Sequence, residues 1–340
     1  MNSIKIYCIL LLFAVFSSCA DPLQQAQPLY KSQKYTIAYP SGDMANQIET
    51  VLKSVKKLST NSIYTAYHFN FDQNISKESV GQLNLESEAN SISYFNESSS
   101  GTATILTYDS NRILVLTCAH IGDFPDTIFT TFHDDEDRIS SVAVRGRSDF
   151  FIRGIPGGDE LDELVRDRKK DLVLYGKQYS SQQEFQLLQL NIPLGKLRKL
   201  QWGSFVYLAG FPMGVKMVTR GIVSLFESSQ KDMYLIDAIF NRGFSGGLVL
   251  AYKQGTNQME WVGLVKSVSA DSYFRLKPSE KKTKYTDENR PYHDELYLVR
   301  TVDINYGVTY AISPDVIQSF LKENKYKLEQ AGFNISRWLE

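Results

Sequence analysis

Short runs of apolar residues, rich in Val, Ile, Leu, Tyr and Phe, are separated by polar segments along most of this chain. Such runs favour β-strands, because branched and aromatic side chains fit a pleated surface. We interpret the following runs as strands: 62–71, 102–107, 113–118, 127–132, 139–145, 171–175, 204–210, 217–226, 233–238, 246–252, 260–268, 296–302 and 307–312. Short strands at close intervals with few helices predict a mainly β fold, either a barrel or a sandwich.

Two segments have helical periodicity instead. Apolar side chains recur every three or four positions in residues 44–58, which predicts an N-terminal amphipathic helix packed on the main domain. A peripheral membrane contact is the alternative for this helix, although its charges are mixed in sign. Residues 315–325 predict a C-terminal helix, with Ser313 as its cap and Pro314 at its start. The charged residues 157–170 predict an exposed helical turn, and the polar residues 277–295 predict a surface loop.

The first residues have the features of an export signal. Residues 6–16 form an apolar run of 11 residues, which is too short to span a bilayer but suits the core of a signal peptide. The order apolar core, Ser17, Ser18 and Cys19 resembles a bacterial lipoprotein signal. The resemblance implies a signal peptide over 1–18, a lipid on Cys19 and an anchored protein on the periplasmic or cell-surface side of the envelope. An ordinary secretory signal and a buried N-terminal strand are the alternatives.

Cysteine usage and charge exclude some classes of protein. The sequence contains three cysteines, Cys8, Cys19 and Cys118. If Cys8 leaves with the signal and Cys19 carries lipid, Cys118 is alone and no intrachain disulfide is expected. The net charge of -1 gives no basic face for a nucleic-acid partner. The polar residues 19–35 predict a flexible tether.

A serine within a glycine-rich turn is the first candidate for chemistry. Ser245 lies in the run DAIFNRGFSGGLVL, between Gly243 and the pair Gly246-Gly247. Glycine tolerates backbone angles that other residues avoid, so such a turn can aim several N–H groups at one point. An acyl-transfer site needs these donors to hold an oxyanion, and the N–H groups of Gly243 and Ser245 are the candidates.

A serine hydroxyl is a weak nucleophile and needs a base beside it. Among four histidines, His120 ends an apolar run followed by small residues, ILVLTCAH, which places its ring on a rigid element. We interpret His68, His133 and His293 as ordinary surface or core residues.

The base needs a carboxylate that orients it. Asp171 immediately precedes the apolar run 172–175, where an unpaired charge would be costly. Asp126, Asp134 and Asp149 are the alternatives, and they lie in less ordered surroundings.

Several motifs together resemble those of trypsin-like serine proteases. LTCAH resembles their TAAH motif, DLVLY is similar to their D-[IL]-A-[LV] motif, and DAIFNRGFSGG resembles DAAINPGNSGG of the HtrA/Deg branch. AGFPMG followed by VTRGIVS resembles GNPFG…VTSGIVS, and GVTYAIS resembles GIGFAIP. The five segments occur in the family's order over residues 100–320. No segment corresponding to the family's PDZ domain is expected.

The resemblance implies a mainly β fold of two six-stranded antiparallel barrels, with an N-terminal and a C-terminal helix. The first barrel would span 61–195 and carry His120 and Asp171, and the second would span 196–325 and carry Ser245. Residues 19–60 would form the tether and the helix, and residues 326–340 a tail. The resemblance also implies an apolar substrate pocket shaped by Ile239, Phe240, Val265, Lys266 and Ser267.

The sequence departs from the family at Arg242, in place of Pro, and at Phe244, in place of Asn. Both can alter the resting shape of the oxyanion loop. The acidic run 133–137 suggests a calcium site, but a solvated loop is the favoured interpretation, so no metal or cofactor is expected.

The motifs predict a serine endopeptidase that hydrolyses exported or misfolded polypeptides, with His120, Asp171 and Ser245 as its triad. A catalytically silent binding module of the same fold is the main alternative. An esterase is a third, although a strand rather than a helix follows Ser245. The oligomeric state and the natural substrate stay open.

Overall fold

The computed structural model describes residues 34–37, 44–109, 111–132, 135–180, 187–225, 232–239, 241–256, 258–278 and 296–339. The predictions for the signal peptide, for Cys19 and for Phe240 therefore lie outside the described residues, as does most of the predicted tether. None of the helices in the described ranges is long and apolar enough to cross a membrane.

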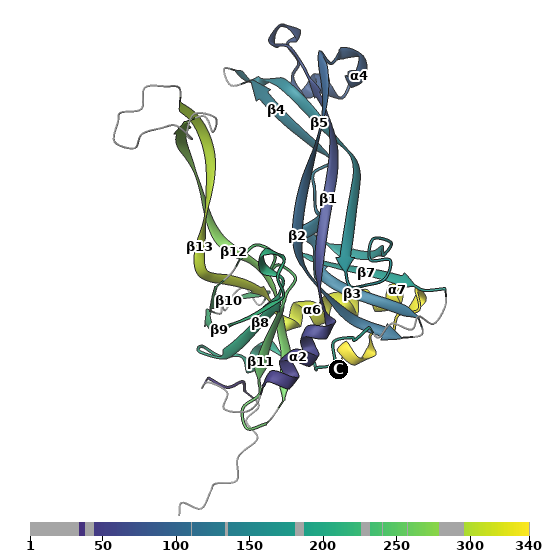
Figure 1. Ribbon diagram of the computed structural model, residues 1–340, viewed down its shortest axis with the longest axis vertical. Helices are drawn as coiled ribbons and strands as arrows, with labels where there is room; N and C mark the ends of the chain where they lie inside the picture. Colours follow the sequence, from purple (N-terminus) through teal and green to yellow (C-terminus); the bar gives the residue numbers. More distant parts are fainter. Residues whose placement is uncertain are drawn as a thin grey trace, which may run out of the picture.

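One half of the molecule is a seven-stranded antiparallel sheet with the strand order β4-β5-β1-β2-β3-β7-β6 (Figure 1). Its strands are β1 (Val55–His68), β2 (Ser91–Asp109), β3 (Arg112–Cys118), β4 (Thr127–Phe132), β5 (Asp135–Arg153), β6 (Asp162–Asp167) and β7 (Leu172–Gln178). The predicted hairpin between residues 102–107 and 113–118 is present as β2 and β3.

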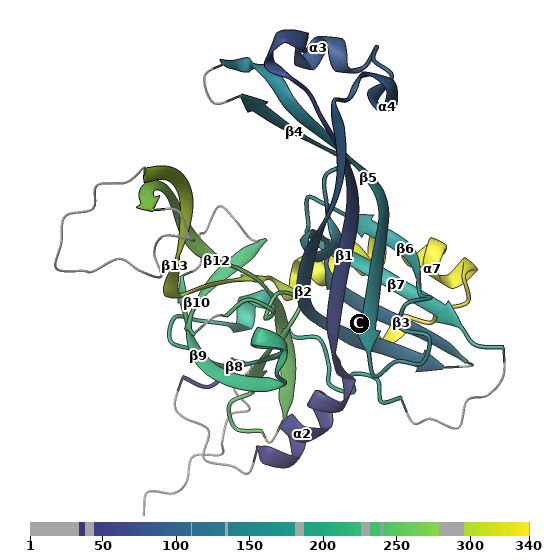
Figure 2. The same ribbon diagram turned by 45° about the horizontal axis from the view of Figure 1, so that its top comes forward.

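Strands β1, β2 and β5 are much longer than the other strands of this sheet. Their far halves, with β4, project from the body of the molecule as an arm (Figures 1 and 2). The tip carries η1 (Phe71–Gln73), α3 (Lys77–Val80) and α4 (Leu85–Glu88) around a small core of its own, formed by Phe69, Ile75, Ile139 and Val142.

The other half is a closed barrel with the strand order β10-β13-β12-β11-β8-β9. Its strands are β8 (Phe205–Gly210), β9 (Met217–Leu225), β10 (Met233–Ala238), β11 (Leu248–Tyr252), β12 (Met259–Pro278) and β13 (Leu296–Ile312). Strands β12 and β13 extend beyond the barrel as a second, two-stranded arm (Figures 1 and 2). Alternate side chains of the barrel strands fill its interior, among them Val206, Leu208, Ile236 and Val249.

Further helices and 3₁₀ turns lie before, between and after the strands. They are α2 (Ala45–Ser54), η2 (Ala119–Gly122), η3 (Leu197–Lys199), η4 (Pro212–Gly214), α6 (Pro314–Glu323), α7 (Lys325–Gln330) and η5 (Ser336–Trp338). Helix α6 begins as predicted, since Ser313 Oγ accepts a hydrogen bond from the Val316 N–H at 3.3 Å and Pro314 occupies the first position. The predicted N-terminal helix ends at Ser54, because residues 55–58 already belong to β1.

Residues 326–339, predicted as a tail, are packed against both halves. Phe333 lies where a side chain at Gly176 of β7 would be, and Trp338 stacks edge-on against Trp261 of β12 with ring centroids 5.6 Å apart. Trp338 is 1% exposed. This C-terminal segment therefore holds the sheet and the barrel in one arrangement.

The mainly β prediction and the closed six-stranded second barrel are confirmed. The first predicted barrel is instead a half-barrel of seven strands. It stays open because its outermost strands are far apart: β4 pairs with β5 on the arm, whereas β6 pairs with β7. The charged residues 157–170, predicted as a helical turn, contribute strand β6.

Candidate active site

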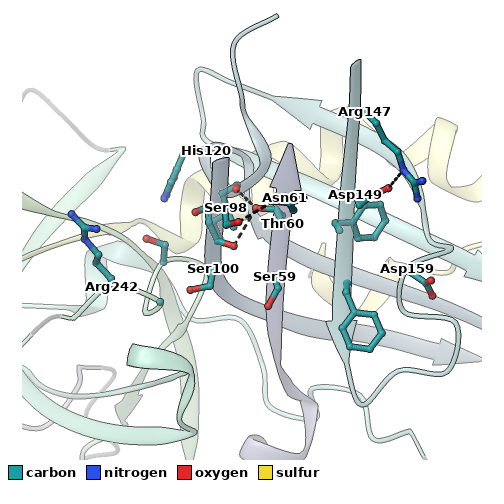
Figure 3. A pocket seen from close by; sticks show the side chains of 16 residues that line it. Ser59, Thr60, Asn61, Ser98, Ser100, His120, Arg147, Asp149, Asp159 and Arg242 are labelled. Carbon is teal, nitrogen blue, oxygen red and sulfur yellow. Dashed lines mark hydrogen bonds and ion pairs between the residues drawn. The ribbon is translucent and has the colours of Figure 1, made fainter. Parts of the chain in front are cut away.

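A cavity of about 960 Å³ is lined by residues of both halves, and the predicted catalytic residues His120 and Ser245 are among them. It is lined by Ser59, Thr60, Asn61, Ser98, Ser99, Ser100, His120, Ile121, Arg147, Asp149, Phe150, Phe151, Asp159, Arg242, Gly243 and Ser245 (Figure 3). His120 enters it from η2, directly after β3, and Ser245 from the loop before β11. The sequence prediction that His120 and Ser245 meet at one cleft is therefore consistent with the structure.

His120 is held by Asp171 at two points. Asp171 Oδ2 lies 2.8 Å from His120 Nδ1, and Asp171 Oδ1 accepts the backbone N–H of His120 at 2.9 Å. Asp171 is 5% exposed, whereas the side chain of His120 is 43% exposed toward the cavity. The pair thus consists of a buried carboxylate and a ring whose other nitrogen, Nε2, is left for a proton transfer.

The backbone at Asp171 is itself unusual. Its φ is +57°, a left-handed conformation that aspartate tolerates better than most residues. Ala119 N–H donates to the Asp171 carbonyl at 3.2 Å, which fixes the start of β7 beside η2. A non-glycine residue held in this region by its surroundings is typical of functional sites.

The alternative carboxylates have other partners. Asp126 forms an ion pair with Arg145, and Asp149 pairs with Arg147 at 2.6 Å. Asp134 lies outside the described residues. Of the described candidates, Asp171 contacts the His120 ring.

The Ser245 hydroxyl is hydrogen-bonded to a backbone carbonyl of the barrel. Its Oγ donates to the Lys266 carbonyl of β12 at 2.9 Å, and no hydrogen bond between the described residues joins it to His120. Ser245 is 9% exposed and borders the cavity. The His–Asp pair is therefore assembled, and Ser245 lies at the same cavity with its hydroxyl bonded to a backbone carbonyl instead of to His120.

The loop before Ser245 presents two N–H groups. The Arg242 carbonyl accepts the Met213 N–H at 2.8 Å, and because C=O and N–H of a trans peptide point in opposite directions, the Gly243 N–H faces away from Met213. Gly243 has φ of +103°, and a Cβ there would lie 2.3 Å from the Phe211 carbonyl. Neither for the Gly243 N–H nor for the Ser245 N–H is a hydrogen-bond acceptor found among the described residues.

The two departures from the family motif leave the cavity open. The Phe244 ring is 1% exposed and packs in the barrel core, so it does not cover Ser245. Arg242 is exposed and lines the cavity.

The predicted apolar pocket stays a prediction. Val265 is fully buried, Ile239 is 64% exposed, and neither lines the cavity beside Ser245. Lys266 lines a smaller hollow on the other side of the His120–Asp171 pair. The side chain of Ser267 lies outside the described residues.

Sequence reasoning missed two residues of the site. Thr102 Oγ1 donates to the Gly243 carbonyl at 2.7 Å and accepts the Phe211 N–H at 2.9 Å, and Thr102 is fully buried. Nothing in the residue type or spacing of Thr102 indicates this role, because its partners are more than 100 positions away.

Cys118 is the second of them. It is buried directly behind the His120–Asp171 pair, and burial together with the Asp171 charge raises the pKa of its thiol well above the usual value. Its Sγ, the His120 ring and the Asp171 carboxylate offer donor atoms within 4.8 Å of one another. These are atom types that can bind a metal ion. The nitrogen of His120 and the oxygen of Asp171, however, are 2.8 Å apart and share a hydrogen bond with each other. The acidic run considered as a calcium site lies partly outside the described residues.

Comparisons with known proteins give the following. No family model and no curated protein matches the sequence. Solved structures that match include one titled crystal structure of Deg5, with 14% identity over 65% of this chain and 83% of that chain, at a TM-score of 0.34. Another is kallikrein-related peptidase 10, with 10% identity over 77% and 95% of the two chains, also at a TM-score of 0.34.

Proposed function

We propose that this protein is a serine endopeptidase in which His120 is the general base, Asp171 orients it and Ser245 is the nucleophile. The observation that carries the proposal is the double hydrogen bond of Asp171 to His120, at a cavity that Ser245 shares. A surface histidine has no need of a buried carboxylate, whereas a catalytic base needs one that fixes its tautomer and stabilises the imidazolium.

The reaction begins when the Ser245 side chain rotates from the Lys266 carbonyl toward the free nitrogen of His120. Ser245 Oγ attacks the substrate carbonyl carbon, and its proton passes to His120 Nε2. The carbonyl electrons move to the oxygen, and the N–H groups of Gly243 and Ser245 receive the oxyanion. The C–N bond then breaks, and the leaving amine takes the proton from His120. Water, deprotonated by His120, hydrolyses the acyl-enzyme and regenerates the Ser245 hydroxyl.

Cleavage of unfolded casein tests this proposal. The purified wild type should release peptides, and Ser245→Ala should abolish this release while keeping the thermal midpoint within a few degrees. Ser204→Ala, at another buried serine, controls for loss of a hydroxyl from the folded chain. Equal casein cleavage by wild type and Ser245→Ala would refute the assignment.

A catalytically silent binding module is the second candidate, and the hydrogen bond from Ser245 Oγ to the Lys266 carbonyl favours it. A fluorophosphonate probe separates the two functions, because it reacts with a serine that its histidine has activated. Labelling of Ser245, absent in His120→Ala, supports the peptidase. A folded protein that takes up no label even with a peptide substrate mimic present supports the binding module.

We also propose that Cys19 carries a lipid that anchors the chain in a cell envelope, on the basis of the sequence before it. Metabolic labelling with an alkyne fatty acid should mark the wild type and leave Cys19→Ala unmarked. Incorporation into both proteins, or into neither, would contradict the anchor without bearing on the peptidase.

A further inference from the structure

One edge of the arm is formed by a stretch of strand that pairs on one side alone among the residues the structure describes. Strand β2 pairs with β1 along residues 91–104, but it pairs with β3 only from Thr104 onward. Within the described part of the chain, residues 91–101 of β2 therefore have one unpaired side. An open strand edge offers a row of N–H and C=O groups to another extended chain.

The direction of the Thr102 backbone groups identifies which residues of β2 present their N–H and C=O groups at this open edge. Its N–H donates to the Ser245 carbonyl at 2.8 Å and its carbonyl accepts the Thr117 hydroxyl, so both backbone groups point away from β1. Alternate residues of an antiparallel strand point their backbone groups to the same side. The open edge is thus formed by the N–H and C=O groups of Ser100, Ser98, Asn96, Tyr94 and Ile92.

The edge starts at the active site. Thr102, which follows the edge along β2, donates its N–H to the carbonyl of the nucleophile Ser245. Ser98, Ser99 and Ser100 line the same cavity as His120 (Figure 3). A chain paired with β2 would therefore run from the scissile bond outward along the arm.

The edge lacks the devices that normally protect an open strand. Residues 91–101 read SISYFNESSSG, with one charged residue and with neither lysine nor proline. Small hydroxyl and amide side chains predominate near the cavity, and they discriminate little between the side chains of a partner. Such an edge fits a partner recognised through its backbone.

An apolar strip continues the cavity along the same face of the arm. Ser59, Asn61 and Ile63 alternate on β1, and their partners Ser100, Ser98 and Asn96 share that face, followed by Tyr94 and Ile92. Ile63, Ile92 and Tyr94 are 40%, 43% and 74% exposed. Side chains of a bound segment can thus find apolar contacts beyond the polar cavity.

We propose that the β2 edge from Ser100 to Ile92 binds the substrate polypeptide as an added β-strand, so that the enzyme selects long unfolded chains over short peptides. This inference rests on the proposed peptidase function. Strand addition takes its affinity from main-chain hydrogen bonds and is tolerant of sequence. Residues 91–100 span about 34 Å at 3.4 Å per residue, so a segment of about ten residues fills the edge.

Peptide length is the first test. Peptides that share one cleavage site should be extended by two, six or ten residues on either side, and kcat/KM measured for each. Several added main-chain hydrogen bonds predict a gain in kcat/KM of about tenfold or more between the two- and ten-residue extensions on one side. No gain on either side would overturn the inference.

Backbone pairing is tested by Asn96→Pro against Asn96→Ala. Proline removes the N–H at an edge position without touching the ladder to β1, and edge strands accept it there. The proline variant should lose about fivefold on the long peptide and nothing on the short one, and the alanine variant should lose neither. Equal behaviour of the two variants on the long peptide would overturn pairing. A loss on the short peptide would place Asn96 in the reaction itself and also overturn it.

Two measurements separate this inference from the peptidase proposal. Anisotropy of a labelled long peptide on Ser245→Ala measures binding without turnover. If the wild type cleaves no peptide but Ser245→Ala binds long peptides tighter than short ones, the peptidase fails and the edge inference stands. Sedimentation of the wild type and of Asn96→Pro tests whether a second copy of the chain occupies the edge instead. If the proline variant dissociates a dimer while the dependence of kcat/KM on peptide length is unchanged, the inference is overturned.

Discussion

The hydroxyl of Thr102 joins the first sheet to the loop that precedes Ser245, because it donates to the Gly243 carbonyl at 2.7 Å. The same oxygen accepts the Phe211 N–H at 2.9 Å, so one buried side chain orients both walls of the oxyanion loop. Thr102 does not touch the reacting atoms and acts as a positioning residue.

Thr102→Val should therefore impair catalysis through the loop. It leaves the Gly243 carbonyl and the Phe211 N–H without their partner, which costs about 1–3 kcal/mol for each buried group. We expect kcat on a short ester substrate to fall while KM changes little. Thr102→Ser keeps the hydroxyl and should restore kcat. If Thr102→Ser is as impaired as Thr102→Val, the methyl group rather than the hydroxyl matters and the positioning role is wrong.

Asp171→Asn tests the orientation of His120. An amide nitrogen facing Nδ1 favours the wrong tautomer of the ring, and the imidazolium loses its counter-charge. Turnover should fall on the order of 10⁴-fold at pH 7. Asp126→Asn removes a carboxylate from a surface pair with Arg145 and should keep wild-type turnover within about twofold. Similar losses in both variants would show that Asp171 acts only on stability.

Gly246→Ala should disrupt the nucleophile loop. Gly246 has φ of +81°, and a Cβ there would lie 2.0 Å from the Thr102 carbonyl, so the backbone must shift. Gly203 has a similar φ of +78° but open space around it. Gly203→Ala thus measures the cost of the backbone angle alone, about 1 kcal/mol. Fluorophosphonate labelling should survive in Gly203→Ala and be lost in Gly246→Ala, and retention in both would contradict the tight fit.

Cys118 should make the stability of the protein depend on alkaline pH. Burial raises the pKa of its thiol in the folded chain, whereas the unfolded thiol titrates at an ordinary pKa of about 8.5. Above that pH the unfolded state binds fewer protons than the folded state, so stability falls as pH rises toward the folded pKa. The thermal midpoint should drop more between pH 8 and pH 10 in the wild type than in Cys118→Ala. Equal drops would show that the thiol does not carry the effect.

The sequence was informative where chemistry restricts the residue type at a short spacing. His120, Asp171 and Ser245 each stand at the edge of a strand within a motif, and the structure places all three at the cavity or directly behind it. Helix α6 was predictable for the same reason, since Ser313 and Pro314 are local signals. The rotamer of Ser245 was not, because it depends on the Lys266 carbonyl from another strand.

The arm segment of β2 and strand β6 were missed because their patterns do not reflect one buried face, whereas the parts of β1, β4 and β5 in the arm were predicted as strands. Residues 91–98 of β2 are exposed on an open edge, so their polar composition resembles that of a loop. Strand β6 carries charges because no strand of the described residues pairs with its outer side. The sequence also did not indicate that the first sheet is open, because closure of a barrel depends on whether its two outermost strands meet in space.

The C-terminal segment has a consequence for the order of biosynthesis. Residues 314–339 follow every strand along the chain, yet Phe333 and Trp338 are what pack against β7 and β12 together. A nascent chain on the ribosome has therefore made both halves before it acquires the segment that fixes them to each other. The position of the sheet relative to the barrel, and with it that of His120 relative to Ser245, is therefore fixed only after translation has passed this segment.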